Sequence, residues 1–370
     1  MAAKKPLIFV TIFVIIFFCG IFVGMNDFLT ENYSSLIKKS TIDSLDQTQV
    51  PVIDESSLNN LINFKNETEV LEKRYEIINY IWKSDELPND YPTSIESNFV
   101  DIRYSELENL KTIEKINIEM KNNVNSIVYL FLPEDSNGKL FIYHQGHAGD
   151  FIHGKETIQK LLISGFSVAA FSMPLEGMNS QPIIELDNIG QVKFFKHNQL
   201  VLLEEENFST LSYFFSPINS TLNYLSDNYA FSDYYMVGIS GGGWTSTVYP
   251  ALDTRISKSF AIAGSTPLSL RIVIDDVGDY EQFHPGLFSI TNYFQIYIMN
   301  SYGEGREFVQ IFNKYDTCCF FNNSFITYGE KIQNFVNELN YGKFTVMVDD
   351  THTGHKISDY IIELIIEKSS

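Results

Sequence analysis

Residues 234–252, YYMVGISGGGWTSTVYPAL, contain the turn on which the fold depends. An apolar run leads into GISGG at 238–242, which matches the pattern G-x-S-x-G, and a run with helical spacing follows. In a nucleophile elbow the serine occupies a sharp strand-to-helix turn, whose strained dihedrals require very small neighbouring residues. The sequence therefore predicts such a turn at Ser240. The competing interpretation is a glycine-rich turn whose serine has no chemical role.

Strand-like runs alternate with helix-like runs on both sides of this turn. The expected strands are 98–104, 111–120, 125–135, 139–145, 166–174, 234–238, 256–264, 307–316 and 343–350. The expected helices are 155–164, 208–228, 244–252, 324–339 and a last one from Ile357. This alternation predicts an α/β fold, with a mostly parallel sheet covered by helices on both faces. Reactive side chains are then expected at the carboxyl ends of the strands.

A serine hydroxyl becomes a nucleophile only when a base removes its proton, and an acid must orient that base. Asp316 ends a late strand, and His355 follows the last strand and precedes the final helix, in the order Ser, acid, His. His355 is preferred over His352 because its loop can reach back over the sheet. A metal interpretation of this H-x-x-H pair lacks a third ligand pattern nearby.

Other aspartates compete for the role of the acid. Asp275, Asp276 and Asp279 precede the late strand and belong to an expected insertion, whereas Asp349 and Asp350 are expected to shape the loop of the base. The oxyanion donors are expected to be the backbone N–H groups of Gly241 and His147, with Ala148 as the next choice for the second donor. The side chains of His144 and His147 are expected to be structural or to line a pocket.

Four pieces in order, YHQGHAG, GISGGG, NKYD and TGHKIS, resemble the α/β-hydrolase superfamily. The resemblance covers roughly residues 100 to 365. The two expected antiparallel strands that lead to LFLPED, and then LFIYHQGH, resemble the branch that contains acetyl xylan esterases, dienelactone hydrolases and prolyl-oligopeptidase-type catalytic domains. It implies the α/β-hydrolase fold with an eight-stranded, mostly parallel sheet, no metal and no organic cofactor. Gln145 departs from the pattern, since relatives often have a second histidine there.

The amino terminus predicts a membrane anchor. Residues 6–26 carry no charge and are long enough for a helix across a bilayer, and Lys4 and Lys5 precede them. The positive-inside rule then places the N-terminus in the cytoplasm and the catalytic domain outside it, at the cell surface, in the periplasm or in a lumen. The alternative is a cleaved signal peptide and a secreted protein.

The expected organisation has four parts. Residues 1–26 form the cytoplasmic tip and transmembrane anchor, and 27–57 form a stalk. Residues 58–98 form a helical lead-in, with one amphipathic helix from Leu58 to Trp82, and 99–370 form the hydrolase domain. A segment at 268–302 is expected to be a cap over the site.

The composition bears on the kind of partner and on the compartment. A net charge of −20 argues against nucleic acid, which is bound by clusters of lysine and arginine. Five N-x-S/T sequons, at Asn32, Asn66, Asn207, Asn219 and Asn322, are weak support for a glycosylated domain.

The main hypothesis is a membrane-anchored serine hydrolase that cleaves carboxylic esters of small molecules or glycans through an acyl-enzyme. The alternatives are a serine peptidase of the prolyl-oligopeptidase type and an inactive α/β-hydrolase-like binding domain. The sequence leaves the oligomeric state open.

Overall fold

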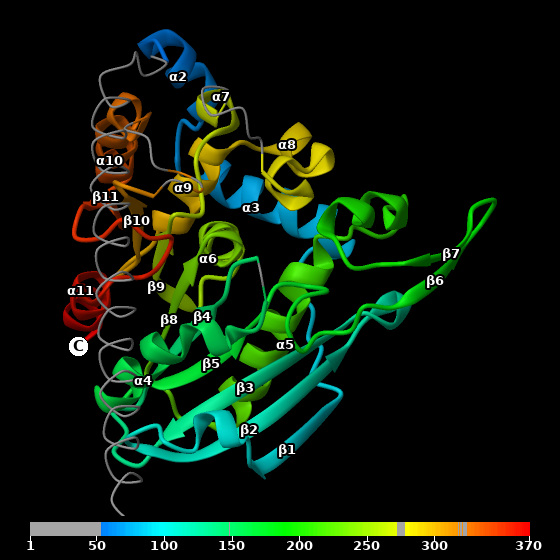
Figure 1. The fold of residues 1–370 in the computed structure, drawn as a ribbon. Coiled ribbons are helices and arrows are strands. Elements are labelled where there is room, and N and C mark those ends of the chain that lie inside the picture. Colours follow the sequence, from blue (N-terminus) through cyan, green and yellow to red (C-terminus); the bar gives the residue numbers. More distant parts are fainter. Residues whose placement is uncertain (1–52, 148, 272–277, 317, 319, 321–323) are drawn as a thin grey trace, which may run out of the picture. The chain divides into compact units, whose positions relative to one another are not determined.

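The computed structural model describes residues 53–147, 149–271, 278–316, 318, 320 and 324–370, which belong to a compact unit from Val50 to Ser370. Its centre is a sheet in the order β1-β2-β3-β5-β4-β8-β9-β10-β11 (Figure 1). The pairs among β1, β2, β3 and β5 are antiparallel, and every pair from β5–β4 to β10–β11 is parallel. The predicted mostly parallel sheet is therefore confirmed, but within the described residues it has nine strands instead of the eight that the resemblance implied, with β1 at its edge.

The observed strands agree closely with the expected runs. They are β1 Ser94–Phe99, β2 Leu110–Glu119, β3 Asn125–Pro133, β4 Lys139–His144, β5 Ser167–Phe171, β8 Asp233–Ile239, β9 Ile256–Ile262, β10 Glu307–Asn313 and β11 Lys343–Asp349. The run at 98–104 is the exception. Its strand lies earlier, and Ile102–Tyr104 form a short 3₁₀ helix capped by Asp101.

Helices cover both faces of this sheet, as Figure 1 shows. The α-helices of the described residues are α2 Glu55–Ile62, α3 Glu67–Trp82, α4 Lys155–Ile163, α5 Ser212–Asn228, α6 Gly241–Leu252, α7 Leu268–Arg271, α8 Pro285–Ile290, α9 Tyr293–Ser301, α10 Gly329–Glu338 and α11 Asp359–Ser369.

Neighbouring side chains of a strand belong to different cores. On β4, Leu140 and Ile142 pack into one core with α5 and α6, whereas Phe141 and Tyr143 pack into the other with α4 and α11. Side chains of a strand point alternately to the two faces of the sheet. Because both faces are buried here, the sequence of the strand is continuously apolar.

The lead-in differs from the prediction of one helix at 58–82. Asn63 takes a left-handed conformation (φ 46°) and ends α2, and the Asn66 side chain accepts the Glu69 N–H and begins α3. Both helices pack against α9, so this segment covers the α/β core. The expected stalk also ends earlier than 57, because α2 begins at Glu55.

The segment 268–302 contains α7, α8 and α9. All residues of α9 are buried, and the helix packs against α6 between strands β9 and β10. This helix therefore serves as the crossover that the parallel pair β9–β10 requires. A cap formed by the earlier part of the segment stays a prediction. The hairpin of β6 Ile183–Leu186 and β7 Gly190–Lys193 was not predicted.

The predicted anchor at 1–26 and most of the predicted stalk lie outside the described residues. Within the described part of the chain, none of the helices is both long and apolar enough to cross a bilayer.

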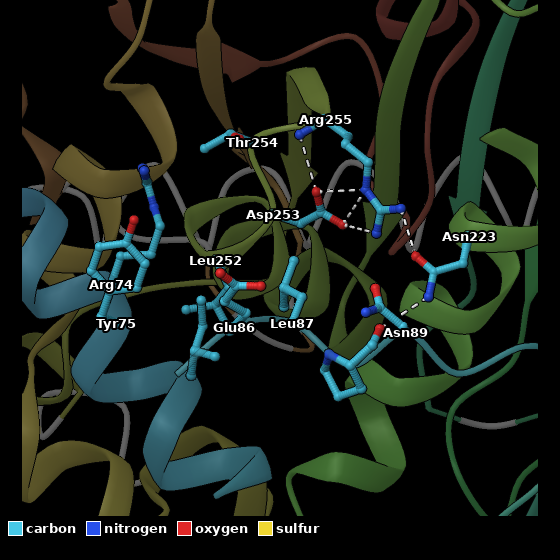
Figure 2. Close-up of a pocket in the computed structure, with 12 residues that line it drawn as sticks. Arg74, Tyr75, Glu86, Leu87, Asn89, Asn223, Leu252, Asp253, Thr254 and Arg255 are labelled. Carbon is cyan, nitrogen blue, oxygen red and sulfur yellow. Dashed lines mark hydrogen bonds and ion pairs between the residues drawn. The ribbon is translucent and has the colours of Figure 1, made fainter. Parts of the chain in front are cut away.

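A cavity of about 440 Å³ lies at the end of α6 that is remote from Ser240 (Figure 2). Asp253 holds Arg255 in an ion pair, and the guanidinium donates to Asn223 and to Asn219. Asn219 is 1% exposed, so its sequon is not open to glycosylation in the folded chain. The twelve residues of α6 separate this cavity from Ser240 by about 18 Å, which excludes it as the site of the serine's chemistry.

Candidate active site

Ser240 lies between β8 and α6 in a strained conformation, with φ 56° and ψ −123°. Its N–H donates to the Ile262 carbonyl on the neighbouring strand at 2.9 Å, and α6 begins at the next residue. A non-glycine residue with positive φ persists only where its surroundings impose it, and such residues cluster at functional sites. The geometry is that of the predicted nucleophile elbow.

The glycines around Ser240 have no room for a side chain. A Cβ on Gly242 would lie 2.0 Å from the His144 carbonyl oxygen. A Cβ on Gly146 would lie 2.6 Å from the Ser240 Cβ and 2.7 Å from the Ile239 carbonyl oxygen. The loop after β4 therefore passes directly over the elbow, which is where an oxyanion donor is needed.

Gly146→Ala is expected to lower kcat/KM for ester hydrolysis by about 100-fold, because a displacement of about 1 Å at a reacting group has an effect of this size. The new methyl group must move either the loop or Ser240. Gly329→Ala is the matched control, since a Cβ there meets its nearest atom at an ordinary 3.4 Å. Steady-state kinetics, with thermal unfolding to verify folding, measure both variants. Equal activities would contradict the close approach.

His355 and Asp316 form a hydrogen-bonded pair. His355 Nδ1 lies 2.5 Å from Asp316 Oδ2, and the other carboxylate oxygen accepts the Cys318 N–H at 2.8 Å. Asp316 is 1% exposed. Because the carboxylate accepts the proton of Nδ1, the lone pair of the ring is on Nε2. His355 Nε2 is buried and has no hydrogen-bond partner among the described residues.

His352 belongs to a separate group. Its Nε2 lies 3.2 Å from Asp349 Oδ2, and Asp349 also accepts hydrogen bonds from Thr351 and Ser358. Burial raises the pKa of Asp349, but these hydrogen bonds outweigh burial and hold it well below its usual range. The two histidines of the H-x-x-H pair thus contact different carboxylates and do not converge on one metal.

None of the remaining candidate aspartates that the structure describes is paired with His355. Asp350 is exposed, and Asp275 and Asp276 lie outside the described residues. Asp279 Oδ2 lies 3.3 Å from His147 Nε2.

Gly241 and His147, whose N–H groups are the expected oxyanion donors, are in contact through the His147 ring. Gly241 is the first residue of α6, and the first N–H groups of a helix have no partner within it. The His147 ring packs over Gly241, where an added Cβ would lie 2.6 Å from His147 Cε1. The donor role of the His147 N–H stays a prediction, and Ala148 lies outside the described residues.

The side chain of His147 has partners that the sequence did not indicate. His147 Nε2 lies 2.9 Å from Glu281 Oε1 and 3.0 Å from His197 Nδ1, and His197 Nδ1 lies 3.1 Å from Glu281 Oε2. Burial raises the pKa of the fully buried Glu281, but the two histidines outweigh burial and hold it well below its usual range. Burial lowers the pKa of His197, but the Glu281 charge outweighs burial and raises it to about 9. KHNQ and DYEQF, the contexts of His197 and Glu281, match no site motif, so only proximity in the fold identifies them.

His144 is expected to make stability fall between pH 6.5 and pH 4. Burial lowers its pKa from 6.5 to about 4. In this window the unfolded chain binds a proton that the folded chain does not, so acidification favours unfolding, by about 3 kcal/mol at pH 4. Urea unfolding at a series of pH values measures the slope, which should be shallower in His144→Gln. The exposed His153→Gln should keep the slope of the unsubstituted chain. Identical slopes for the His144 variant and the unsubstituted chain would contradict the assignment.

No protein-family model matches the chain, and no curated protein matches it. Among solved structures, it is similar to an acetyl xylan esterase from Paenibacillus sp. R4, with a TM-score of 0.55, 12% identity and coverage of 85% of this chain and 98% of that one. Acetyl xylan esterase 1 from Thermoanaerobacterium sp. JW/SL YS485 has a TM-score of 0.54 at 13% identity, with 86% and 100% covered. A glucuronoyl esterase from Solibacter usitatus has a TM-score of 0.50 at 12% identity, with 86% and 94% covered.

At these identities the likeness shows the fold, which is the α/β-hydrolase fold in the form that acetyl xylan esterases have. The resemblance drawn from the four sequence pieces is therefore confirmed at the level of the fold.

Proposed function

We propose that this protein is a serine hydrolase that cleaves carboxylic esters. The observation that carries the proposal is the His355–Asp316 pair, whose buried Nε2 has no partner among the described residues, at the same edge of the sheet as the strained turn of Ser240. In this arrangement Ser240 is the nucleophile, His355 the general base, and Asp316 the acid that orients the base.

The reaction proceeds in two halves. His355 Nε2 takes the proton of Ser240 Oγ while the oxygen attacks the ester carbonyl, and the Gly241 and His147 N–H groups stabilise the negative charge on the former carbonyl oxygen. The intermediate collapses, and the departing alcohol takes the proton from His355. Water then attacks the acyl-enzyme with the same base, which releases the acid and restores Ser240.

The structure contains no hydrogen bond between Ser240 Oγ and His355 Nε2, which has no partner among the described residues. Hydrogen bonds of catalytic groups are often long or poorly aligned in ligand-free enzymes and shorten when the substrate binds. The proposal therefore requires Ser240 Oγ and His355 Nε2 to come within hydrogen-bond distance when the substrate binds.

Esters are preferred over amides as substrates because the similar solved structures named above are esterases by title. The net charge of −20 disfavours substrates with many negative charges, which leaves neutral acyl esters of small molecules or glycans. We also keep the anchor at 1–26 as part of the proposal. It would tether the hydrolase outside the cytoplasm.

A substrate panel tests the function directly. The full chain should hydrolyse short-chain 4-nitrophenyl esters and acetylated sugars, and should leave prolyl anilides intact. Amide cleavage at a comparable rate would instead support the peptidase alternative. Inactivity on every ester, together with no labelling by a fluorophosphonate probe, would support the inactive binding domain.

A further inference from the structure

Four side chains from three separate segments converge beside the elbow, and we infer that they bind one divalent transition-metal ion such as Zn²⁺. The ligands are His147 Nε2, His197 Nδ1 and a Glu281 carboxylate oxygen, with Asp279 on the solvent side. One ligand atom from each of the first three residues lies within 4.8 Å of the others. Imidazole and carboxylate ligands in this number suit zinc and its neighbours in the periodic table.

The ligands come from parts of the chain that only the fold brings together. His147 lies in the loop after β4, and His197 begins the 3₁₀ helix η4 (His197–Leu203). Glu281 lies in the 3₁₀ helix η6 (Tyr280–Phe283), of which Asp279 is the N-cap. The side chains of His197 and Glu281 are 2% and 0% exposed, whereas those of His147 and Asp279 are 23% and 45% exposed. The site is thus closed on the inside and open to solvent on one side.

The hydrogen bond that His197 Nε2 makes determines whether Nδ1 of the same ring can bind a metal. His197 Nε2 lies 2.8 Å from the Pro174 carbonyl oxygen, which can only accept a hydrogen bond. Nε2 therefore carries the proton, and in a neutral ring the lone pair is on Nδ1, directed at Glu281 and His147. A metal-binding histidine usually donates its other N–H to a carbonyl or carboxylate in this way.

His147 Nε2 has more polar neighbours than a single N–H group can donate to. Its neighbours are His197 Nδ1 at 3.0 Å, Glu281 Oε1 at 2.9 Å and Asp279 Oδ2 at 3.3 Å. An imidazole nitrogen has a single bonding direction in the plane of its ring, so it can donate to one of the three. A cation between them accepts electron pairs from all of them at once. Ligand atoms around a tetrahedral zinc at its usual bond lengths lie about 3.3 Å apart, close to the distances seen here.

Charge also favours a cation. A carboxylate as buried as that of Glu281 must be compensated, and Asp279 adds a second negative charge at the rim. A proton can take the place of the metal only if His197 becomes an imidazolium. Glu281 and Asp279 would both stabilise that imidazolium, but His147 Nε2 would still face three polar atoms with at most one proton to share among them.

The site would act on the elbow by positioning the loop after β4. His147 packs over Gly241, and its backbone N–H is the proposed second oxyanion donor. A metal that joins this loop to η4 and η6 would reduce the freedom of that donor. The inference of a metal site does not depend on the proposed hydrolase function. It differs from the expectation of no metal that the family resemblance implied.

The experiment measures metal binding without reference to activity. The purified full chain is stripped with a chelator and titrated with Zn²⁺ by calorimetry and with Co²⁺ by visible absorption. One ion per chain is expected, with the absorption of a cobalt bound by nitrogen and oxygen in four-coordinate geometry. His147→Gln and His197→Gln should each weaken Zn²⁺ binding by about 100-fold. Loss of a residue that only hydrogen-bonds to a metal ligand already weakens binding by up to about this factor.

His284→Gln is the matched control. His284 is also buried, 1% exposed, but its Nε2 contacts the carboxylate of Glu204 alone, at 2.8 Å. This variant should bind Zn²⁺ as the unsubstituted chain does. If His197→Gln fails to fold, His147→Gln at the partly exposed position decides the question. An unsubstituted chain that binds neither ion, or a His147 variant that binds both normally, would overturn the inference. Fluorophosphonate labelling of the stripped chain tests the hydrolase proposal separately.

Discussion

Ser240→Ala is expected to abolish ester hydrolysis, with a loss in kcat of about 10⁴-fold or more, as is found when the nucleophile of a serine triad is removed. The loss is large because the hydroxyl that forms the acyl-enzyme is itself removed. Covalent labelling by a fluorophosphonate probe should disappear in the same variant. Circular dichroism and thermal unfolding should show that Ser240→Ala stays folded. The substitution is not expected to relieve the backbone strain at this positive φ, since alanine has a Cβ as serine does.

Ser246→Ala is the matched control for this variant. Ser246 is a buried serine of α6, the helix that follows Ser240, and its hydroxyl has no hydrogen-bond partner among the described residues. It should be labelled and should turn over ester as the unsubstituted chain does. Equal labelling of Ser240→Ala and the unsubstituted chain would remove Ser240 from the mechanism.

His355→Ala and Asp316→Asn are each expected to lower kcat by about 10⁴-fold, in the first case because the base is lost and in the second because the ring loses the partner that sets its tautomer. Their effects should not add, since the two residues act as one unit. The double variant is therefore expected to resemble His355→Ala. Steady-state kinetics of the two single variants and the double variant measure this.

His352→Ala separates this effect from damage to the loop. It removes the contact of His352 with Asp349 but leaves His355 and Asp316 in place. We expect a lower melting temperature with kcat retained within a few-fold, since Asp349 keeps its hydrogen bonds to Thr351 and Ser358. A loss of activity as large as that of His355→Ala would mean that the base has been misassigned.

Local patterns predicted most of the sheet. The strands β2, β3, β4, β8, β10 and β11 begin and end close to the expected runs, because strands buried on both faces are continuously apolar and turn residues bound them. The failures have local causes as well. The helix expected at 58–82 breaks at Asn63, where an asparagine can take positive φ, and no periodicity marks the hairpin of β6 and β7, whose side chains are largely exposed.

The candidate site divides in the same way. Ser240, Asp316 and His355 lie one, three and six residues after β8, β10 and β11, so a pattern of strands that share a direction is enough to place them at one edge. The sequence pattern does not, however, predict which carboxylate each histidine contacts. His352 and His355 are three residues apart, and only the packing of the loop after β11 directs one to Asp349 and the other to Asp316.

By itself, the sequence determined that this chain is an α/β protein with a strained serine turn after a central strand, because both properties arise from neighbouring residues. Tertiary structure alone decided which imidazole meets which carboxylate, and it brought His147, His197 and Glu281 within 3.1 Å of one another. The reason is the separation along the chain. His197 and Glu281 are 84 residues apart and His147 and Glu281 are 134 apart, so their contact depends on how the loops above β4, β5 and β9 pack together. No periodicity or local motif encodes that packing.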